Sequence, residues 1–279
     1  MPRSPCGAGC IGGTVPRVRR VTAWWRLALA AGAALVALLC VPALGLVGQV
    51  GRLRFQRSFF VVLAAALGVR VAAVGGDDLA GRVEPRPGQG ALLVSNHVSW
   101  LDVVAVNTVA PVRCLAKAEI AGWPVIGPLA SAAGTVFVDR AALSRLPGTV
   151  FELSRALREG WLVAVFGEGT TRCGKQVGRF HNAPFQAALE ADAVVRPVTV
   201  RYRLAGAGET THPAMIAGDS LLDCARRIAR LSGLIVEVRI GEPIAPSRAG
   251  DRRLLAAFAE TAVRGTLREA RVRVRETSR

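Results

Sequence analysis

An uncharged apolar run from Leu27 to Val50 is the feature that most restricts how this chain can fold. As a helix, a run of this length can cross the ~30 Å hydrocarbon core of a bilayer. A second uncharged apolar run, Ser58–Val69, follows almost at once and is too short to span. The first part of the chain is therefore expected to associate with a membrane.

Three interpretations of these two runs are open. The first run can be a secretory signal, for which Ala43-Leu44-Gly45 offers a small-x-small cleavage site. It can also be a single membrane span. In the third interpretation, which we favour, the two runs form a helical hairpin or interfacial pair, bent at Pro42 and Gly45. Three arginines after the first run would then lie at the lipid headgroups, namely Arg52, Arg54 and Arg57.

Residues 1–26 are rich in glycine, proline and arginine, and we expect a basic disordered tail that ends at the interfacial pair Trp24–Trp25. The whole chain has a formal net charge of +16, which favours polyanionic partners such as anionic lipid or nucleic acid. Only 5% of the residues are aromatic, so few side chains could stack on bases, and no nucleic-acid partner is expected. The predicted organisation is a tail (1–26), a membrane-associated helical segment (27–74) and a folded domain (75–279).

From Gly75 onward, short runs rich in valine and isoleucine alternate with helical patterns, which is typical of an α/β or α+β sheet domain. The expected strands are Ala91–Ser95, Thr135–Val138, Leu162–Phe166, Val194–Tyr202 and Leu234–Ile240. Helices are expected around Val150–Leu157, at Leu221–Leu231 and at Arg252–Arg273. Pro197, inside one expected strand, predicts either an edge strand or the first residue of pairing.

The six cysteines are scattered and contain no Cys-x-x-Cys pair. Cys6 and Cys10 have no histidine or second cysteine pair close in the sequence that would complete a zinc site. No metal site and no disulfide framework are therefore predicted, and we expect a reduced domain that faces the cytosol.

A histidine and an aspartate follow the expected strand Ala91–Ser95, as Asn96-His97 and then Asp102. Loops at the carboxyl ends of sheet strands commonly gather side chains into a cleft. His97 and Asp102 can meet if His97 lies in the loop before a helix and Asp102 in its first turns. The carboxylate would then hold one imidazole nitrogen while the other accepts a proton. Alternatively, Asn96 and Asp102 only cap a helix and His97 is a surface residue.

A glycine-rich loop follows the expected strand Leu162–Phe166 and carries Glu168, Gly169 and Thr170. Its exposed backbone N–H groups would suit an anionic ligand, although it can equally be an ordinary loop with a solvated glutamate. It lacks the pattern of a Walker-type nucleotide loop. Arg140 ends another expected strand and Lys117 is one of two lysines, and each alone is explained by a surface ion pair.

Together and in this order, the motifs resemble those of the glycerolipid acyltransferases, typified by 1-acylglycerol-3-phosphate acyltransferase. The family pattern is NHxxxxD, GxxFxxR, a phenylalanine-initiated EGT loop and a proline-bearing strand. The matching residues are Asn96-His97 with Asp102, then Gly134, Phe137 and Arg140, then Phe166 with Glu168-Gly169-Thr170, and Pro197. The segments Lys117-Ala118-Glu119 and Trp123–Gly127 also look like the family, so the resemblance covers roughly residues 75–205.

The resemblance implies a mixed α/β sheet flanked by helices, with membrane-associated helices at the N-terminus. It implies that His97 is the general base and Asp102 its orienting partner, with acyl-CoA or acyl-carrier protein as co-substrate and no other cofactor. Glu168, Gly169, Thr170 and Arg140 are the implied acceptor-binding residues. For a phosphate-bearing acceptor, Lys117 or Arg172 is expected to join Arg140.

Two departures from the family pattern affect the choice of acceptor. Gly167 stands where proline is usual, which should loosen the loop, and Thr171 stands where arginine often follows the EGT. From the sequence we favour 1-acylglycerol 3-phosphate, with a phosphate-free lyso-lipid such as lyso-ornithine lipid as the alternative. A non-catalytic basic membrane-binding protein is the alternative from another class. The expected location is the cell membrane with the domain on the cytoplasmic side; no oligomeric state is predicted.

Overall fold

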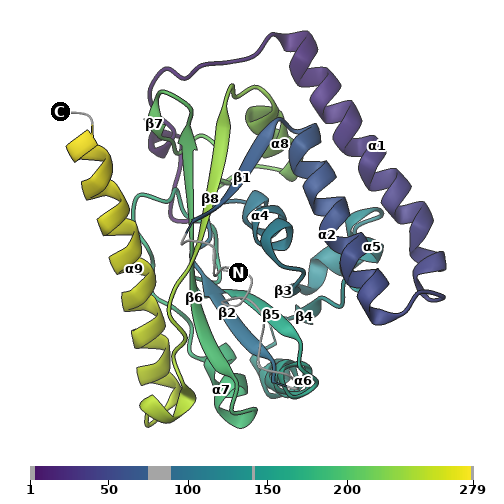
Figure 1. The fold of residues 1–279 in the computed structure, drawn as a ribbon, viewed down its shortest axis with the longest axis vertical. Helices are drawn as coiled ribbons and strands as arrows, with labels where there is room; N and C mark the ends of the chain where they lie inside the picture. Colours follow the sequence, from purple (N-terminus) through teal and green to yellow (C-terminus); the bar gives the residue numbers. More distant parts are fainter. Residues whose placement is uncertain (1–3, 75–88, 140–141, 278–279) are drawn as a thin grey trace.

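The computed structural model describes residues 4–74, 89–139 and 142–277. Its centre is one sheet in the strand order β1-β8-β6-β2-β5-β3-β4, with β7 paired to β6 (Figure 1). The strands are β1 (Val69–Val74), β2 (Ala91–Ser95), β3 (Arg113–Lys117), β4 (Val136–Val138), β5 (Leu162–Phe166), β6 (Val194–Leu204), β7 (Gly208–Glu209) and β8 (Leu234–Ile240). Strands β6, β2, β5, β3 and β4 are mutually parallel, whereas β8 runs antiparallel to β6. The predicted mixed α/β sheet is confirmed.

Helices cover both faces of this sheet (Figure 1). On one face lie α1 (Arg20–Leu44), α2 (Gln49–Ala66), α4 (Leu101–Val109), α5 (Ile126–Ala132) and α8 (Leu221–Ala229), and on the other lie α6 (Leu146–Arg158), α7 (Ala183–Glu190) and α9 (Arg252–Thr277). Strand β2 is buried along its whole length and alternates between the two cores. Leu93 belongs to the core under α4, whereas Leu92 and Val94 belong to the core under α6, α7 and α9. This alternation is what a central strand with two covered faces requires.

The expected strands at β2, β5 and β8 have the predicted bounds, and those at β4 and β6 differ by one and two residues at one end. Three strands were missed: β1, β3 and the two-residue β7. β1 lies inside the predicted membrane-associated segment but pairs with β8 throughout, so the sheet begins before the boundary expected at residue 75. β3 was missed because its short sequence, Arg-Cys-Leu-Ala-Lys, mixes charged and small residues.

The sequence predicted that Pro197 lies either on an edge strand or where strand pairing begins, and the structure shows the second arrangement. β6 is a central strand, paired with β2 on one side and β8 on the other. The carbonyl of Pro197 accepts from the Gly241 N–H at 2.8 Å, so the side of Pro197 that lacks an N–H faces β8. Pairing with β8 starts at the next residue, Val198. Proline therefore stands immediately before the first residue that is paired with β8.

Helices α1 and α2 form the predicted pair, lying against each other beside α4 (Figure 1). Within the described residues, α1 is the one helix long and apolar enough to cross a membrane, and 6% of its most apolar window is buried. α2 is joined to the domain by Gln56, whose amide donates to Asn107 Oδ1 at 2.7 Å and to the Val112 carbonyl at 2.9 Å. The pair thus has one side fixed to the domain and one apolar side left exposed.

Residues 4–26 differ from the disordered tail expected over residues 1–26, of which residues 1–3 lie outside the described part of the chain. Helix α1 already begins at Arg20, and the residues before it are held by backbone hydrogen bonds. The N–H of Ala217 donates to the Cys6 carbonyl at 2.9 Å, and that of Ser232 donates to the Pro16 carbonyl at 2.9 Å. The composition of this segment, rich in glycine, proline and arginine, is typical of disorder. Its order depends on hydrogen-bond partners more than 200 residues away in the sequence, which composition does not reveal.

Candidate active site

Four parallel strands end at one edge of the sheet and bring the predicted motifs together. In register, Ser95 of β2 lies beside Phe166 of β5, and Lys117 of β3 lies beside Val138 of β4. The loops that follow therefore place His97, Glu168 and Asp139 at the same edge as Lys117. Arg140, the next residue along from Asp139, lies outside the described residues.

His97 and Asp102 meet as the sequence predicted. His97 lies in the loop before α4, Asp102 lies in the first turn of that helix, and the Nδ1–Oδ2 distance is 2.8 Å. Asp102 is fully buried, whereas the His97 side chain is 20% exposed. Because Nδ1 is engaged by the carboxylate, Nε2 is the nitrogen available to a substrate. A half-buried imidazole held in this way can act as a general base.

The Asp102 carboxylate is fixed by three further donors. Its Oδ2 accepts from the N–H groups of Val98 at 2.6 Å and Ser99 at 2.8 Å. Its Oδ1 accepts from the hydroxyl of Tyr202. A buried charge needs such partners to offset its loss of water. Asp102 therefore orients His97 rather than capping a helix, which was the alternative.

Tyr202 was not predicted as a site residue. It reaches Asp102 because β6 continues beyond the end of β2, where Ser95 is paired with Val198. Burial and the neighbouring Asp102 carboxylate raise the pKa of the Tyr202 hydroxyl well above its ordinary value. The phenol therefore stays protonated and remains a donor to Asp102.

Asn96 ties the His97 loop to the same part of β6. Its side-chain amide donates to the Val200 carbonyl at 2.9 Å, and its side-chain carbonyl accepts from the Val200 N–H at 2.9 Å. This pair of bonds imitates one more rung of the ladder between β2 and β6. The strand register is thereby carried to the residue beside His97.

Glu168 faces inward and holds the two loops together. Its Oε1 accepts from the His97 N–H at 3.0 Å, and its Oε2 accepts from the Gly178 N–H at 2.8 Å. The guanidinium of Arg172 lies beside the same oxygen, with an Nε–Oε2 distance of 2.8 Å. Burial raises the pKa of Glu168, while these hydrogen bonds and the Arg172 charge oppose that rise. Arg172 is therefore engaged within the protein.

Gly167 and Phe166 shape the wall beside the imidazole. The Phe166 ring stacks on His97 at 4.1 Å between centroids. A Cβ on Gly167 would come within 2.6 Å of the buried ring of Phe180. Phe180 thus occupies the space that a larger residue at position 167 would need, and its packing offsets the looseness expected from glycine there.

The remaining predicted residues are placed as follows. Gly169 has a φ of +65°, a conformation that glycine adopts without strain, and it turns the loop after Glu168. Thr170 is half-buried in the same loop, and Lys117 is half-buried at the end of β3. Thr171 donates its hydroxyl to the Met215 carbonyl at 2.7 Å.

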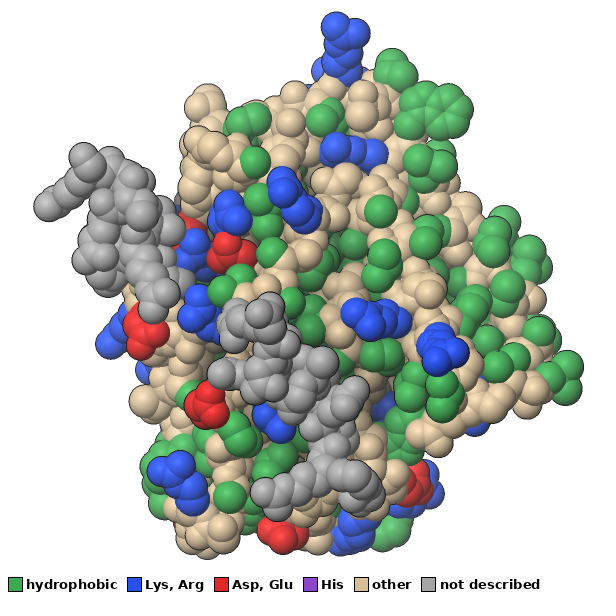
Figure 2. Space-filling view, in the orientation of Figure 1, with side chains coloured by type: hydrophobic (Ala, Val, Ile, Leu, Met, Phe, Trp, Pro, Cys, Tyr) green, Lys and Arg blue, Asp and Glu red, His purple; other side chains and the backbone are tan. Residues whose placement is uncertain are grey.

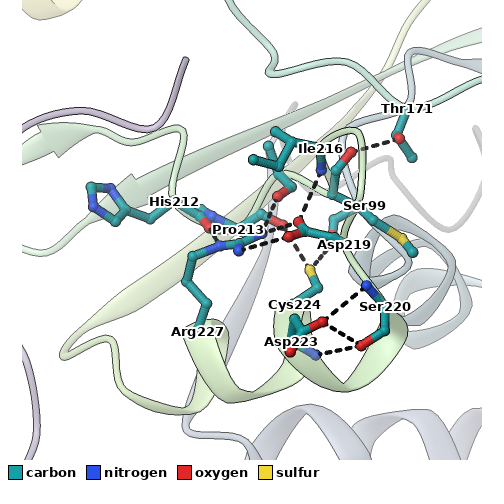
Figure 3. Close-up of polar contacts among 12 residues, drawn as sticks. Ser99, Thr171, His212, Pro213, Ile216, Asp219, Ser220, Asp223, Cys224 and Arg227 are labelled. Atoms are coloured by element: carbon teal, nitrogen blue, oxygen red, sulfur yellow. Dashed lines mark hydrogen bonds and ion pairs between the residues drawn. The ribbon is translucent and has the colours of Figure 1, made fainter. Parts of the chain in front are cut away.

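The segment His212–Asp219 braces these loops and was not recognised in the sequence (Figure 3). Arg227 of α8 donates to the His212 carbonyl at 2.7 Å and its Nη2 lies 2.6 Å from Asp219 Oδ2. From this segment the Met215 N–H donates to the Val98 carbonyl at 2.9 Å. Arg227 therefore holds the segment His212–Asp219 in place, and this segment in turn is hydrogen-bonded to the loop that carries His97.

A cavity of about 490 Å³ lies next to this arrangement. It is lined by Val98 and Tyr202 from the site and by Cys173, Gly174 and Lys175 from the end of the glycine-rich loop. Arg201 and Glu209 add charged groups of opposite sign. The site therefore adjoins a cavity with both apolar and charged walls.

An imidazole held by a buried carboxylate thus stands at the edge of a sheet beside an apolar helical pair, an arrangement that suits base-assisted transfer chemistry near a membrane. The family model described as Acyltransferase matches residues 79–201. A lyso-ornithine lipid O-acyltransferase of Pseudomonas aeruginosa is 37% identical over 76% of this chain and 78% of its own length. The chain belongs to this acyltransferase family and is an acyltransferase.

Further relatives carry two different names. A lyso-ornithine lipid O-acyltransferase of Brucella abortus is 34% identical over 78% of this chain and 83% of its own length. A 1-acyl-sn-glycerol-3-phosphate acyltransferase of Neisseria gonorrhoeae is 35% identical over 57% of this chain and 62% of its own. The crystal structure of the Thermotoga maritima 1-acyl-sn-glycerophosphate acyltransferase PlsC shares the fold, with a TM-score of 0.69 and 19% identity over 90% of this chain and 95% of that one. The chain therefore acts on a lysophospholipid or a related lipid.

Tyr202→Phe is expected to lower kcat about three- to tenfold with little change in KM. The substitution removes one donor to Asp102, and a hydrogen bond to a charged group contributes about 1.5–3 kcal/mol. The carboxylate keeps its three other donors, so it is held less firmly but remains in place. Steady-state kinetics and thermal unfolding of the variant test this; an unchanged kcat would show that Tyr202 does not position the pair.

Tyr202 is the single tyrosine in the sequence, so tyrosinate absorbance in an alkaline titration reports this residue alone. Its folded-state pKa is raised, and its contribution to stability is therefore fully present below pH ~10 and is lost at higher pH. We expect tyrosinate to form only as the protein unfolds. Titration near pH 10 in the folded protein would contradict the buried hydrogen bond.

Proposed function

We propose that the chain transfers a fatty acyl group from acyl-CoA or acyl-carrier protein to the free hydroxyl of a phosphate-free lyso-lipid of the lyso-ornithine class. Membership in the acyltransferase family supports the reaction type. The polar contacts of Thr171 and Arg172 support the acceptor class, and they are the observation that carries the choice.

In this proposal His97 Nε2 removes the proton of the acceptor hydroxyl as its oxygen attacks the thioester carbonyl. The new C–O bond forms, the C–S bond breaks, and the thiolate leaving group receives the proton from the imidazolium. Asp102 keeps the Nδ1–H directed toward itself and stabilises the imidazolium while it exists. No acyl-enzyme forms, so the reaction requires no serine or cysteine nucleophile.

The acceptor follows from the groups around Glu168. Thr171 occupies the position after Glu168-Gly169-Thr170, and its hydroxyl is already donated to the Met215 carbonyl. Arg172, the basic residue nearest to that position in the loop, is paired with Glu168. A phosphate dianion would have to compete with a buried carboxylate for this guanidinium. An ornithine head group carries no phosphate, so its binding does not require Arg172 to leave Glu168.

The acceptor 1-acylglycerol 3-phosphate is the second candidate. The motif Gly134, Phe137 and Arg140 is in register with the family pattern, and the Neisseria relative is named for that activity. In this case Arg140 together with Lys117 would bind the phosphate. The sequence alone favoured this acceptor; the ion pair between Arg172 and Glu168 supports our choice of the phosphate-free one.

The purified protein is expected to turn over lyso-ornithine lipid with a kcat/KM at least about tenfold above that for 1-acylglycerol 3-phosphate. Arg172→Ala should lower kcat/KM for both acceptors by a similar factor, because Arg172 acts through Glu168 and leaves the acceptor alone. Arg179→Ala, an exposed arginine of the same loop, is the matched control and should change neither value.

The ratio of the two kcat/KM values decides between the acceptors. If Arg172→Ala raises KM tenfold or more for 1-acylglycerol 3-phosphate alone, Arg172 binds phosphate and the proposal is wrong. A wild-type preference for 1-acylglycerol 3-phosphate would contradict it independently of any variant.

We further propose that α1 and α2 hold the protein on the cytoplasmic face of the cell membrane, where a lipid acceptor and a soluble thioester donor can both reach the site. Large apolar side chains gather over these helices, with basic residues among them (Figure 2). The most exposed of them on α1 are Val21, Trp24, Trp25, Leu29, Leu35, Val36 and Leu39. Arg52 and Arg54 are exposed on α2, and each arginine near anionic headgroups adds about 1 kcal/mol of attraction.

Protease added to inside-out vesicles is expected to digest the domain from residue 75 onward, because that side of the membrane would be the outer face of the vesicle. Right-side-out vesicles from the same cells should protect it. Protection in inside-out vesicles would place the domain on the other side and refute the topology.

A further inference from the structure

Three cysteine thiols come together where the N-terminal segment meets the end of the glycine-rich loop. The sulfurs of Cys6, Cys10 and Cys173 all lie within 4.8 Å of one another, and in the described part of the chain no other group of histidine, cysteine and carboxylate ligands is as compact. Cys6 and Cys173 are buried and Cys10 is half-buried. The sequence predicted no metal site because Cys173 is remote from the first two cysteines along the chain.

The backbone holds all three thiols in position. The Cys173 N–H donates to Cys6 Sγ at 3.2 Å, so the sulfur of Cys6 is held against the backbone of Cys173. The Cys6 carbonyl accepts from the Ala217 N–H at 2.9 Å, and the Cys10 carbonyl accepts from the Thr211 hydroxyl at 2.8 Å. Both ends of the Cys6–Cys10 segment are thus fastened to the domain, which limits the ordering that a ligand would have to impose.

The surroundings also suit a charged sulfur cluster. Cys10 and Cys173 both line the 490 Å³ cavity, which leaves one side of the cluster open to a further ligand such as water. Lys175, one of two lysines in the chain, lines the same cavity and lies close enough to Cys173 for its charge to act on the sulfur. Three thiolates with a divalent ion carry one negative charge, which Lys175 would balance.

We propose that Cys6, Cys10 and Cys173 bind one thiophilic d¹⁰ cation, with Zn²⁺ as the probe, leaving a fourth coordination position toward the cavity. Thiolates bind Zn²⁺ at about 2.3 Å, which places the sulfurs of a tetrahedral site about 3.8 Å apart. Shifts of about 0.5 Å per sulfur would bring this cluster to that spacing. The ion would fasten the N-terminal segment to the loop that follows Glu168 and Arg172. The proposal does not depend on the identity of the acceptor lipid.

The test uses the full chain, purified in detergent with a thiol-free reductant, loaded with Zn²⁺ and dialysed before metal analysis. About one Zn²⁺ per chain is expected for the wild type and for Cys40→Ser, a matched control in α1. Cys6→Ser and Cys173→Ser should each lower Zn²⁺ affinity at least about tenfold. Loading with Co²⁺ in place of Zn²⁺ should give a sulfur-to-metal charge-transfer band in the wild type and the control.

Cys10 provides the variant that remains informative if the buried substitutions prevent folding. Cys10→Ser should keep the fold and remove about one third of the Co²⁺ charge-transfer intensity, because one of three sulfurs is lost. Less than about a tenth of an equivalent of metal in the reduced wild type would overturn the proposal. So would an unchanged Co²⁺ band in Cys10→Ser, an equal loss in Cys40→Ser, or a disulfide between two of the three cysteines that persists in the reductant.

Discussion

His97→Ala is expected to lower kcat by about 10²–10⁴-fold, because it removes the group proposed to accept the proton of the attacking hydroxyl. This loss corresponds to about 2.7–5.5 kcal/mol of transition-state stabilisation. Asp102 keeps its three other donors after this truncation, so the fold should persist, although the loss of a mostly buried side chain should lower the melting temperature. Single-turnover kinetics with a lyso-lipid acceptor measure the chemical step directly.

His97→Gln is the matched variant for this prediction. It keeps a polar side chain near Asp102 but supplies no basic nitrogen, so its kcat should fall as far as that of His97→Ala. Binding of both variants to anionic vesicles should equal that of the wild type, since α1 and α2 are unaffected. Near-full activity of either variant would show that another group removes the proton and that the mechanism is wrong.

The His97–Asp102 pair could be predicted from the sequence because its parts are local. A buried strand ends at Ser95, and the two residues follow within one loop and one helical turn, so their contact depends only on where α4 begins. The edge at which Lys117 and Glu168 join them follows from the parallel order of β2, β5 and β3. The strands β2 and β5 were found because each is a nearly continuous apolar run, and β8 because it is rich in valine and isoleucine.

The partners of this pair could not be predicted, because they depend on register and on packing between distant segments. Tyr202 reaches Asp102 only because β6 extends beyond the last residue of β2. No motif in either strand indicates this difference in length. Phe180 fills the space beside Gly167, and Cys173 meets Cys6, through contacts that the sequence spacing does not encode. Residues 4–19 have the composition of a disordered segment, yet the backbone groups of Cys6, Pro16 and Val18 are paired with the domain. Local composition therefore predicts the strands well, but it does not predict the residues that hold the site in place from distant parts of the chain.

Asp102→Asn is expected to lower kcat by about 10²–10³-fold with little change in KM, because the amide is nearly isosteric but carries no charge to stabilise the imidazolium. Its oxygen can still accept from the N–H groups of Val98 and Ser99, and its NH₂ can face the Tyr202 hydroxyl, so the fold should persist. Asp102→Ala should instead leave these buried donors unpaired, at about 1–3 kcal/mol each, and unfold the protein or lower its melting temperature strongly.

A double-mutant cycle separates positioning from a merely structural role. If Asp102 acts through His97, then His97→Ala made in the Asp102→Asn background should cost far less than it does in the wild type, because the two residues work as one unit. Asp223→Asn, which changes an exposed carboxylate in the first turn of α8, is the matched control and should leave kcat unchanged. Additive losses in the cycle would contradict the proposed pair, since they would mean that Asp102 stabilises the loop without acting on the imidazole.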